Sequence, residues 1–410
     1  MQPSFTIDIK RFLTTTLLYG FAYSIWELFF NLYILSLGFN SDTLGLVRSA
    51  PPLAALLLGL PLGVLSDRIG RRKSMLLGLS TCILGMFFQI QLQQPGLIFF
   101  FGLIQGTGLM LYQVSQPPFI MAVSREEDQA MVFSLNFGLI TLASTIGSLV
   151  GGQLPNLFES VFGLTAGLAN SYRWIIASAI GFAAIGLLPL FLISENQAFK
   201  NHRKNSLLKK NFFQNLAKNP VARQLTLINL ITGFGAALLI PYLNVFLKGR
   251  FDISDNLLGL IFSISSLFVF LGTMLSPKLV KITQSRIIPT VFTQGFSLIF
   301  LFLLGFSPTF WIVFIGLLMR TVLMQMSTPL LENYAMLISP PGEQGLIASI
   351  RGSAWQFGQT VGLFVSGIVQ TRFGFSPLFI TTGLLYAFAI MLTWIYFRPG
   401  EKELTYAGKV

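Results

Sequence analysis

The chain alternates from end to end between long apolar stretches and short polar ones. A helix needs about 20 mostly apolar residues to cross the hydrocarbon core of a bilayer. Against that length, the pattern predicts twelve membrane spans in an all-α membrane protein. They are expected at residues 11–37, 43–66, 73–92, 96–122, 130–156, 171–195, 223–249, 256–277, 285–306, 309–337, 345–369 and 376–398.

The longest polar stretch inside the chain lies between the sixth and seventh predicted spans. We therefore expect an N-terminal six-helix bundle at 1–195, a cytoplasmic linker at 196–222 and a C-terminal six-helix bundle at 223–410. Because each half holds an even number of spans, both halves would enter the membrane from the same side. Parallel repeats of this kind build transporters whose substrate binds between the halves, near the midplane.

Matching residues in the two halves support a repeat. An offset of 213 places Asn31 on Asn244, and an offset of 212 places Gln113 on Gln325. An offset of 215 places Gly147 on Gly362. The offset drifts slowly along the chain, which is typical of duplicated halves. The repeat also pairs Ser41-Asp42 with Ser254-Asp255, where we expect both acids to cap helix N-termini.

Composition agrees with a membrane protein. The chain is 53% hydrophobic and only 10% charged, whereas a soluble domain carries about 25% charged residues. Its net charge of +12 comes from short loops on one side of the predicted spans. This bias predicts a multi-pass protein of the plasma membrane with both termini in the cytoplasm. Basic residues spread over short loops do not indicate a nucleic-acid partner.

A compact charge cluster, G-V-L-S-D-R-I-G-R-R-K, occupies residues 63–73 between the second and third predicted spans. It closely resembles the loop motif of the major facilitator superfamily, roughly G-x-[LVI]-x-D-R-x-G-R-[RK]-[RK]. Its matching positions include Gly63, Asp67, Arg68, Gly70, Arg71, Arg72 and Lys73. The second half carries a degenerate copy without the aspartate, from Gly272 to Arg286.

The resemblance implies two six-helix bundles that rock about a central cavity lined by spans 1, 4, 7 and 10. It implies contacts between the bundles through spans 2, 5, 8 and 11, with the remaining spans against lipid. The residues of loop 63–73 would then form a conformational latch, in which Asp67 faces the positive N-terminal end of a helix in the other half. A merely topogenic turn is the alternative.

Ionisable residues inside spans are candidates for function. Glu27 in the first span could bind and release a proton, serve as the fixed partner of a buried arginine, or contact the substrate. Arg320 in the tenth span could hold an anionic group of the substrate, because a guanidinium matches carboxylates. It could equally pair with Glu27. Arg48 could join Glu27 or reach the membrane surface.

Two further groups complete the candidate site. Glu332 and Arg351 lie at similar depth in spans 10 and 11, so we expect a salt bridge with a gating or structural role. Amide side chains on four presumed cavity helices could bind polar substrate groups or hydrogen-bond between helices. They are Asn31, Gln113, Asn244 and Gln325.

These features favour a secondary transporter that works by alternating access. We expect a monomer among membrane lipids that exports a small amphipathic or lipid-like molecule, with proton coupling through Glu27. The alternative is uptake or uniport of a small organic anion through Arg320. A non-transporting receptor fits less well because loop 63–73 is intact. Without a phosphate-binding loop, a cluster of metal ligands or a histidine in any span, the sequence predicts no ATP-driven pump, metal site, cofactor or enzyme.

Overall fold

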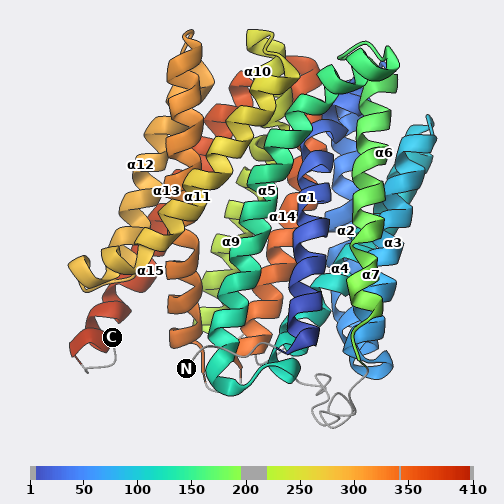
Figure 1. Cartoon of the computed structure of the whole chain (residues 1–410). Helices are drawn as coiled ribbons and strands as arrows, with labels where there is room; N and C mark the ends of the chain where they lie inside the picture. Colours follow the sequence, from blue (N-terminus) through green and yellow to red (C-terminus); the bar gives the residue numbers. More distant parts are fainter. Residues whose placement is uncertain (1–5, 195–218, 341–342, 407–410) are drawn as a thin grey trace. The chain divides into compact units, whose positions relative to one another are not determined.

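The structure is a computed structural model, and it describes residues 6–194, 219–340 and 343–406. Over those ranges the chain is helical and no strand occurs (Figure 1). The helices are α1 Ile7–Ser36, α2 Ser41–Ile69, α3 Arg71–Gln91, α4 Pro95–Val123, α5 Glu126–Phe162, α6 Ala169–Ile185, α7 Leu187–Phe191, α9 Pro220–Leu239, η2 Ile240–Tyr242, α10 Leu243–Phe251, α11 Asp255–Thr283, α12 Ile287–Phe306, α13 Phe310–Ile338, α14 Gln344–Phe373 and α15 Ser376–Tyr406.

Each predicted span falls on one of these helices or on a short series of them. The sixth span is α6 with α7, and the seventh is α9, the 3₁₀ turn η2 and α10. In the described part of the chain, ten helical segments are long and apolar enough to cross a membrane. Two other long helices, α1 and α14, fall outside that set, and they carry Glu27 and Arg351. The all-α membrane fold expected from the sequence is confirmed.

The helices form two units. Unit 1 comprises Met1–Asn205 with Asn244–Ser266, and unit 2 comprises Ser206–Leu243 with Leu267–Val410. Residues 244–266, which we call the α10–α11 hairpin, thus pack in unit 1 although they comprise the end of the seventh span and the start of the eighth. Most of the expected linker at 196–222 lies outside the described residues, and the proposed bundle boundaries stay a prediction.

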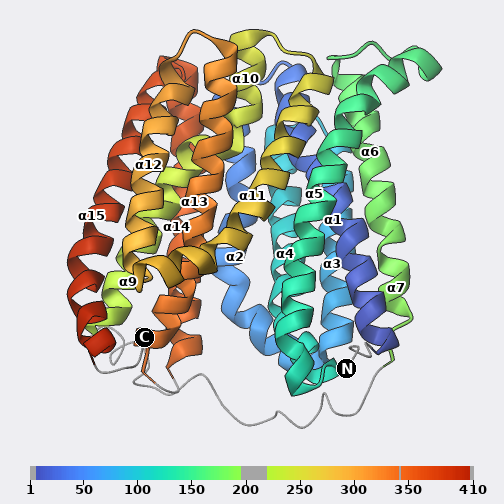
Figure 2. The same cartoon turned by 60° about the vertical axis from the view of Figure 1, so that its left-hand side comes forward.

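Helix contacts inside the two units follow the predicted repeat. In unit 1, α1 packs against α5 and α6, and α3 packs against α4. In unit 2, the corresponding α9 packs against α14 and α15, and α12 lies between α13 and α15 (Figure 2). Equivalent glycines allow equivalent approaches. A Cβ added to Gly147 would lie 2.6 Å from the carbonyl oxygen of Phe21, and one added to Gly362 would lie 2.7 Å from that of Phe234.

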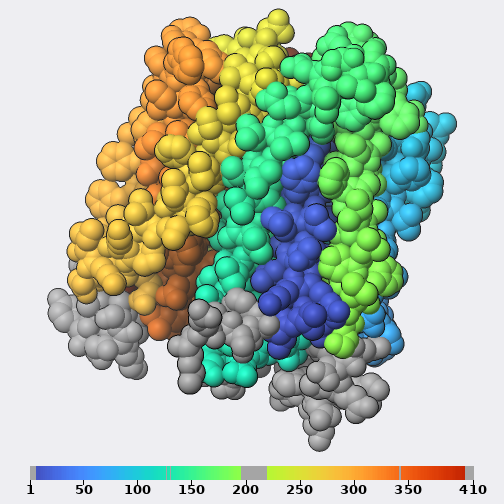
Figure 3. All heavy atoms as spheres, in the orientation of Figure 1, coloured from blue at the N-terminus to red at the C-terminus, as the bar shows by residue number. Residues whose placement is uncertain are grey.

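Unit 1 presents large apolar side chains on its surface. Figure 3 shows α1 between α5 and α6 on one face of this unit. Phe137 and Ile140 of α5, with Phe182 and Leu188 of α6 and α7, are each more than 40% exposed. In water such surface would be costly, whereas hydrocarbon tails cover it without penalty, and the helices satisfy their own backbone groups as a bilayer requires. The chain is therefore a multi-pass integral membrane protein.

Candidate functional site

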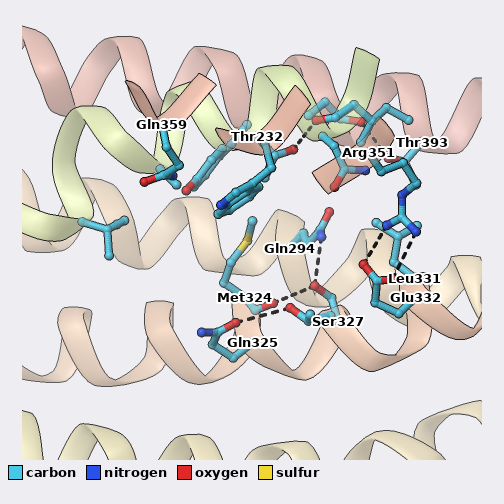
Figure 4. A pocket seen from close by; sticks show the side chains of 18 of the residues that line it. Thr232, Gln294, Met324, Gln325, Ser327, Leu331, Glu332, Arg351, Gln359 and Thr393 are labelled. Carbon is cyan, nitrogen blue, oxygen red and sulfur yellow. Dashed lines mark hydrogen bonds and ion pairs between the residues drawn. The ribbon is translucent and has the colours of Figure 1, made fainter. Parts of the chain in front are cut away.

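Unit 2 contains a cavity of about 570 Å³. Side chains from α9, η2, α12, α13, α14 and α15 line it (Figure 4). Drug-sized ligands occupy pockets of roughly 300–1,000 Å³, so the volume suits a small organic molecule. The polar lining residues are Asn229, Thr232, Gln294, Arg320, Gln325, Ser327, Thr328, Glu332, Arg351, Gln359, Tyr386 and Thr393. Apolar lining residues include Ile228, Pro241, Met324, Leu331 and Trp355.

A break in the seventh span shapes one wall of this cavity. The α-helical part of the span ends at Leu239, and Ile240–Tyr242 form a 3₁₀ turn before α10 begins. Proline has no backbone N–H and its ring displaces the carbonyl of the preceding turn, so Pro241 accounts for the change in helix type. Ile240 and Pro241 both line the cavity.

Neutral polar side chains in the cavity are already held by hydrogen bonds. The Gln294 amide donates to the Ser327 hydroxyl at 2.9 Å, and the Gln359 amide donates to the Gly233 carbonyl at 2.9 Å. The Thr232 hydroxyl donates to the Ile228 carbonyl of its own helix at 2.7 Å. Figure 4 shows Gln359 and the pair Arg351–Glu332 at opposite ends of the cavity. Fixed polar groups over an apolar surface orient a ligand without dominating its affinity.

Arg351 and Glu332 form the salt bridge that their depth predicts. The guanidinium donates to both carboxylate oxygens, Nη1 to Oε2 at 3.1 Å and Nη2 to Oε1 at 2.7 Å. The Arg351 side chain is 5% exposed, whereas that of Glu332 is 52% exposed. The fork thus neutralises a buried cation with a carboxylate at the open side of the cavity. Its gating role stays a prediction.

Arg320 lies in the same cavity with a different set of partners. It is 4% exposed, and its Nη2 donates to the Tyr386 hydroxyl at 3.2 Å. Its guanidinium carbon lies 5.7 Å from the centre of the Tyr386 ring. The sequence left open whether Glu27 pairs with Arg48 or with Arg320, and the structure selects Arg48.

Of the spans and residues that we expected to line a central cavity, only some line the cavity of unit 2. Arg320 and Gln325 contribute to it, as do α9 and α13, the predicted spans 7 and 10. The lining also includes α12, α14 and α15, so spans 9 and 12, which were expected to face lipid, also contribute to this cavity. Sequence reasoning missed Gln294, Trp355 and Tyr386. The polarity of the eleventh span was the available signal, since α14 supplies Trp355 and Gln359.

Glu27 and Arg48 form a two-bond fork between α1 and α2 in unit 1. Arg48 Nη2 donates to Glu27 Oε2 at 2.6 Å and Nη1 donates to Oε1 at 3.1 Å. The Glu27 side chain is 36% exposed and that of Arg48 is 13% exposed. Arg48 therefore joins Glu27 and does not extend to the membrane surface. The Glu27 carboxylate is thus both paired and partly exposed.

The amides Asn31 and Asn244 bond each other. Asn31 Nδ2 donates to Asn244 Oδ1 at 3.0 Å, and Asn244 Nδ2 donates to the Leu28 carbonyl at 2.9 Å. Both residues are buried, at 0% and 4% exposure. Of the two interpretations of the sequence, interhelical hydrogen bonding describes this pair. Gln113 is exposed on α4, and neither it nor the two asparagines line the cavity of unit 2.

Loop 63–73 is tied to its own unit. Asp67 forms an ion pair with Arg71, which also donates to the Ser66 hydroxyl at 2.9 Å. Arg72 donates to the Phe191 carbonyl at the end of α7, at 2.6 Å. Gly70 has a φ of +95° and ends α2, a backbone conformation that glycine adopts without strain.

Two residues of loop 63–73, Gly63 and Arg68, show no contact in the described part of the chain that explains their place in the motif. A Cβ on Gly63 would meet no atom of the described residues within 4 Å, so close packing does not account for Gly63 in this conformation. Arg68 is exposed. The latch role of the loop, with Arg68 and Gly63 in it, stays a prediction.

A second charged cluster joins α6 to the α10–α11 hairpin within unit 1. Asp255 is 6% exposed and forms an ion pair with Lys248. The Tyr172 hydroxyl donates to both Asp255 carboxylate oxygens, at 3.1 and 3.2 Å. The capping role predicted for Asp255 is wrong, because its carboxylate serves this cluster, whereas the Ser254 hydroxyl accepts from the Leu257 amide at 3.3 Å. Asp42 accepts from the Thr43 amide at 2.7 Å.

Comparison with known proteins extends these observations. A family model described as Major Facilitator Superfamily matches residues 12–291 and 225–409. The multidrug resistance protein MdtG of Proteus mirabilis (strain HI4320) is 21% identical over 274 residues, which span 65% of this chain and 65% of that relative. The uncharacterized MFS-type transporter YfkF of Bacillus subtilis (strain 168) is 28% identical over 150 residues, or 35% of this chain and 36% of that protein.

Solved structures share the fold. The nucleoside transporter NupG has a TM-score of 0.72 at 16% identity, covering 95% of this chain and 98% of that one. A D-xylose-proton symporter has a TM-score of 0.74 at 14% identity, covering 94% and 97%. The human organic anion transporter MFSD10 has a TM-score of 0.68 at 17% identity, covering 96% and 100%. At these identities the likeness shows the fold alone.

Proposed function

The chain belongs to the Major Facilitator Superfamily of secondary transporters, and we propose that it exports an amphipathic small molecule in exchange for protons. The cavity of unit 2 carries this proposal, because about 570 Å³ of mixed lining is matched to a small molecule with an apolar body and a few polar groups. Trp355 and Met324 offer the apolar surface, and Gln294 and Gln359 offer fixed amides.

The Glu27–Arg48 fork is the proposed coupling site. While the pair is intact, each charge is compensated by the other in a low-dielectric environment. A proton on Glu27 removes its negative charge and thereby weakens the ion pair that joins α1 to α2. Tyr23 also hydrogen-bonds Glu27 and supports the ionised carboxylate in the intact pair. Protonation and pair opening are thus linked, and this linkage lets a proton gradient drive a conformational change.

The export direction is supported by the similarity to the Proteus protein MdtG, a multidrug resistance protein. The positive-inside distribution supports cytoplasmic termini in a plasma membrane. We further propose a monomer in contact with lipids, with Glu332–Arg351 and loop 63–73 (Gly63, Asp67, Arg68, Gly70, Arg71, Arg72) as gating elements. Asn31 and Asn244 would then act as a buried hydrogen-bonded joint that opens during the cycle.

Reconstituted vesicles test the coupling. Proteoliposomes holding a lipophilic fluorescent dye are given a pH gradient, and dye movement is followed in wild type, Glu27→Gln and Glu159→Gln. Glu159 is exposed at the end of α5, so its variant is the matched control for loss of one carboxylate. We expect gradient-driven transport in wild type and the control, and its loss in Glu27→Gln. Transport that does not depend on the pH gradient, or that persists unchanged in Glu27→Gln, would refute proton coupling through Glu27.

A further inference from the structure

Arg320 differs from the other arginines inside the predicted spans. Arg48 and Arg351 each form a two-bond fork with a carboxylate, from Glu27 and Glu332 respectively. Arg320 is 4% exposed, yet within the described part of the chain no carboxylate lies in salt-bridge contact with it. Its hydrogen-bond partner among the described residues is the neutral Tyr386 hydroxyl, and its buried Nε, like that of Arg351, has no hydrogen-bond partner there.

A buried guanidinium in this state is costly. An ionised group taken from water needs a counter-charge and partners for its N–H groups. Tyr386 supplies one oxygen and the face of a ring 5.7 Å away, which stabilises a cation only modestly. Among the described residues, Arg320 therefore has no carboxylate of its own. The charged residues that line the cavity are Arg320, Arg351 and Glu332, and they leave one positive charge in excess.

We infer that the cavity of unit 2 selects a small organic carboxylate, with its carboxylate on Arg320 and Tyr386 and its apolar body against Trp355 and Met324. A guanidinium and a phenol hydroxyl can both donate to one carboxylate, a charge-assisted arrangement stronger than bonds between neutral groups. This inference rests on the proposed function, since it names the charge class of the substrate for the same cavity. It is independent of transport direction and of the coupling role of Glu27.

Binding in detergent tests the inference without requiring transport. The probes are carboxylates and their neutral amides in matched pairs, such as 1-naphthylacetate with 1-naphthylacetamide and 4-phenylbutyrate with 4-phenylbutyramide. Affinity is read from the rise in Tm with ligand concentration. We expect wild type to bind at least one carboxylate tenfold or more tightly than its amide. Arg320→Gln should abolish that preference, and Tyr386→Phe should reduce it several-fold.

A stability comparison guards against a misfolded variant. Without a ligand, Arg320→Met removes an uncompensated charge and should leave Tm unchanged or raise it, whereas Arg351→Met strips Glu332 of its partner and should lower Tm. The inference is overturned if wild type prefers none of the carboxylates, or if the preference survives in Arg320→Gln. Gradient-driven dye transport would persist in either of those cases, so failure here is distinguishable from failure of the proposed function.

Discussion

Replacing Gly259 with alanine tests how the α10–α11 hairpin packs against α5. A Cβ at Gly259 would lie 2.5 Å from the Ser148 carbonyl oxygen and 2.6 Å from Gly152 Cα, both backbone atoms. Ordinary contact begins near 3.4 Å, so the helices would have to separate by about 0.9 Å. Overpacking of this kind costs typically about 1–3 kcal/mol, which shifts an equilibrium roughly 5- to 140-fold.

A cysteine pair reports this separation. The Gln153 side chain of α5 donates to the Asn256 side chain of α11 across the same contact at 2.5 Å, so cysteines at these two positions would lie close together. Cys82 is the chain's single cysteine, and the pair is therefore introduced into a Cys82→Ser protein. We expect Gly259→Ala to slow disulfide formation between Gln153→Cys and Asn256→Cys by roughly 5- to 140-fold, on the same magnitude of overpacking. Gly249→Ala is the control, because a Cβ on Gly249 of α10 would meet no described atom within 4 Å.

The outcome bears on alternating access. If the hairpin must leave α5 during the cycle, Gly259→Ala favours the separated arrangement and changes transport as well as cross-linking. Equal cross-linking rates in Gly259→Ala and Gly249→Ala would refute the packing argument, because the backbone would then have absorbed the methyl group without moving the helix.

Two stability predictions accompany this one. Lys248→Met leaves the 6% exposed Asp255 without its cation, and we expect the free energy of unfolding to fall by on the order of 3 kcal/mol. The loss would be read as a lower Tm, which adding Asp255→Asn should largely restore. A Tm within error of wild type would count against a stabilising role for the cluster. Gly70→Ala forces a φ of +95° and a ψ of 149° on a residue with a side chain and should cost about 1–3 kcal/mol of stability. Gly63→Ala adds a methyl group in open space and should leave Tm unchanged; matching effects on Tm at the two positions would contradict the backbone explanation.

The positions of the spans were predictable because the signal is local. A stretch of about 20 apolar residues has one stable state in a bilayer, a helix that satisfies its own backbone groups. The Glu332–Arg351 salt bridge was also predictable, since both residues lie at the same depth in consecutive spans and opposite charges there attract strongly.

Side-chain partners across helices were harder to predict. Asp255 follows a serine at a helix start, a local pattern typical of a cap, but a lysine and a tyrosine from other helices compete for its carboxylate. Asn31 and Asn244 gave no sign of whether they point at each other or at a substrate. Rotation of a helix by a fraction of a turn decides such cases, and packing sets that rotation.

The sequence by itself determined the class, the positions of the spans and the basic loop 63–73, because each rests on residues near one another in the chain. The repeat was visible as matching residues at offsets of 212 to 215. Only the tertiary structure decided which arginine Glu27 pairs with, and it placed Arg320 beside Tyr386 with no described carboxylate in salt-bridge contact. The physical reason is that a buried charge is defined by what surrounds it, and those surroundings come from helices far apart in sequence.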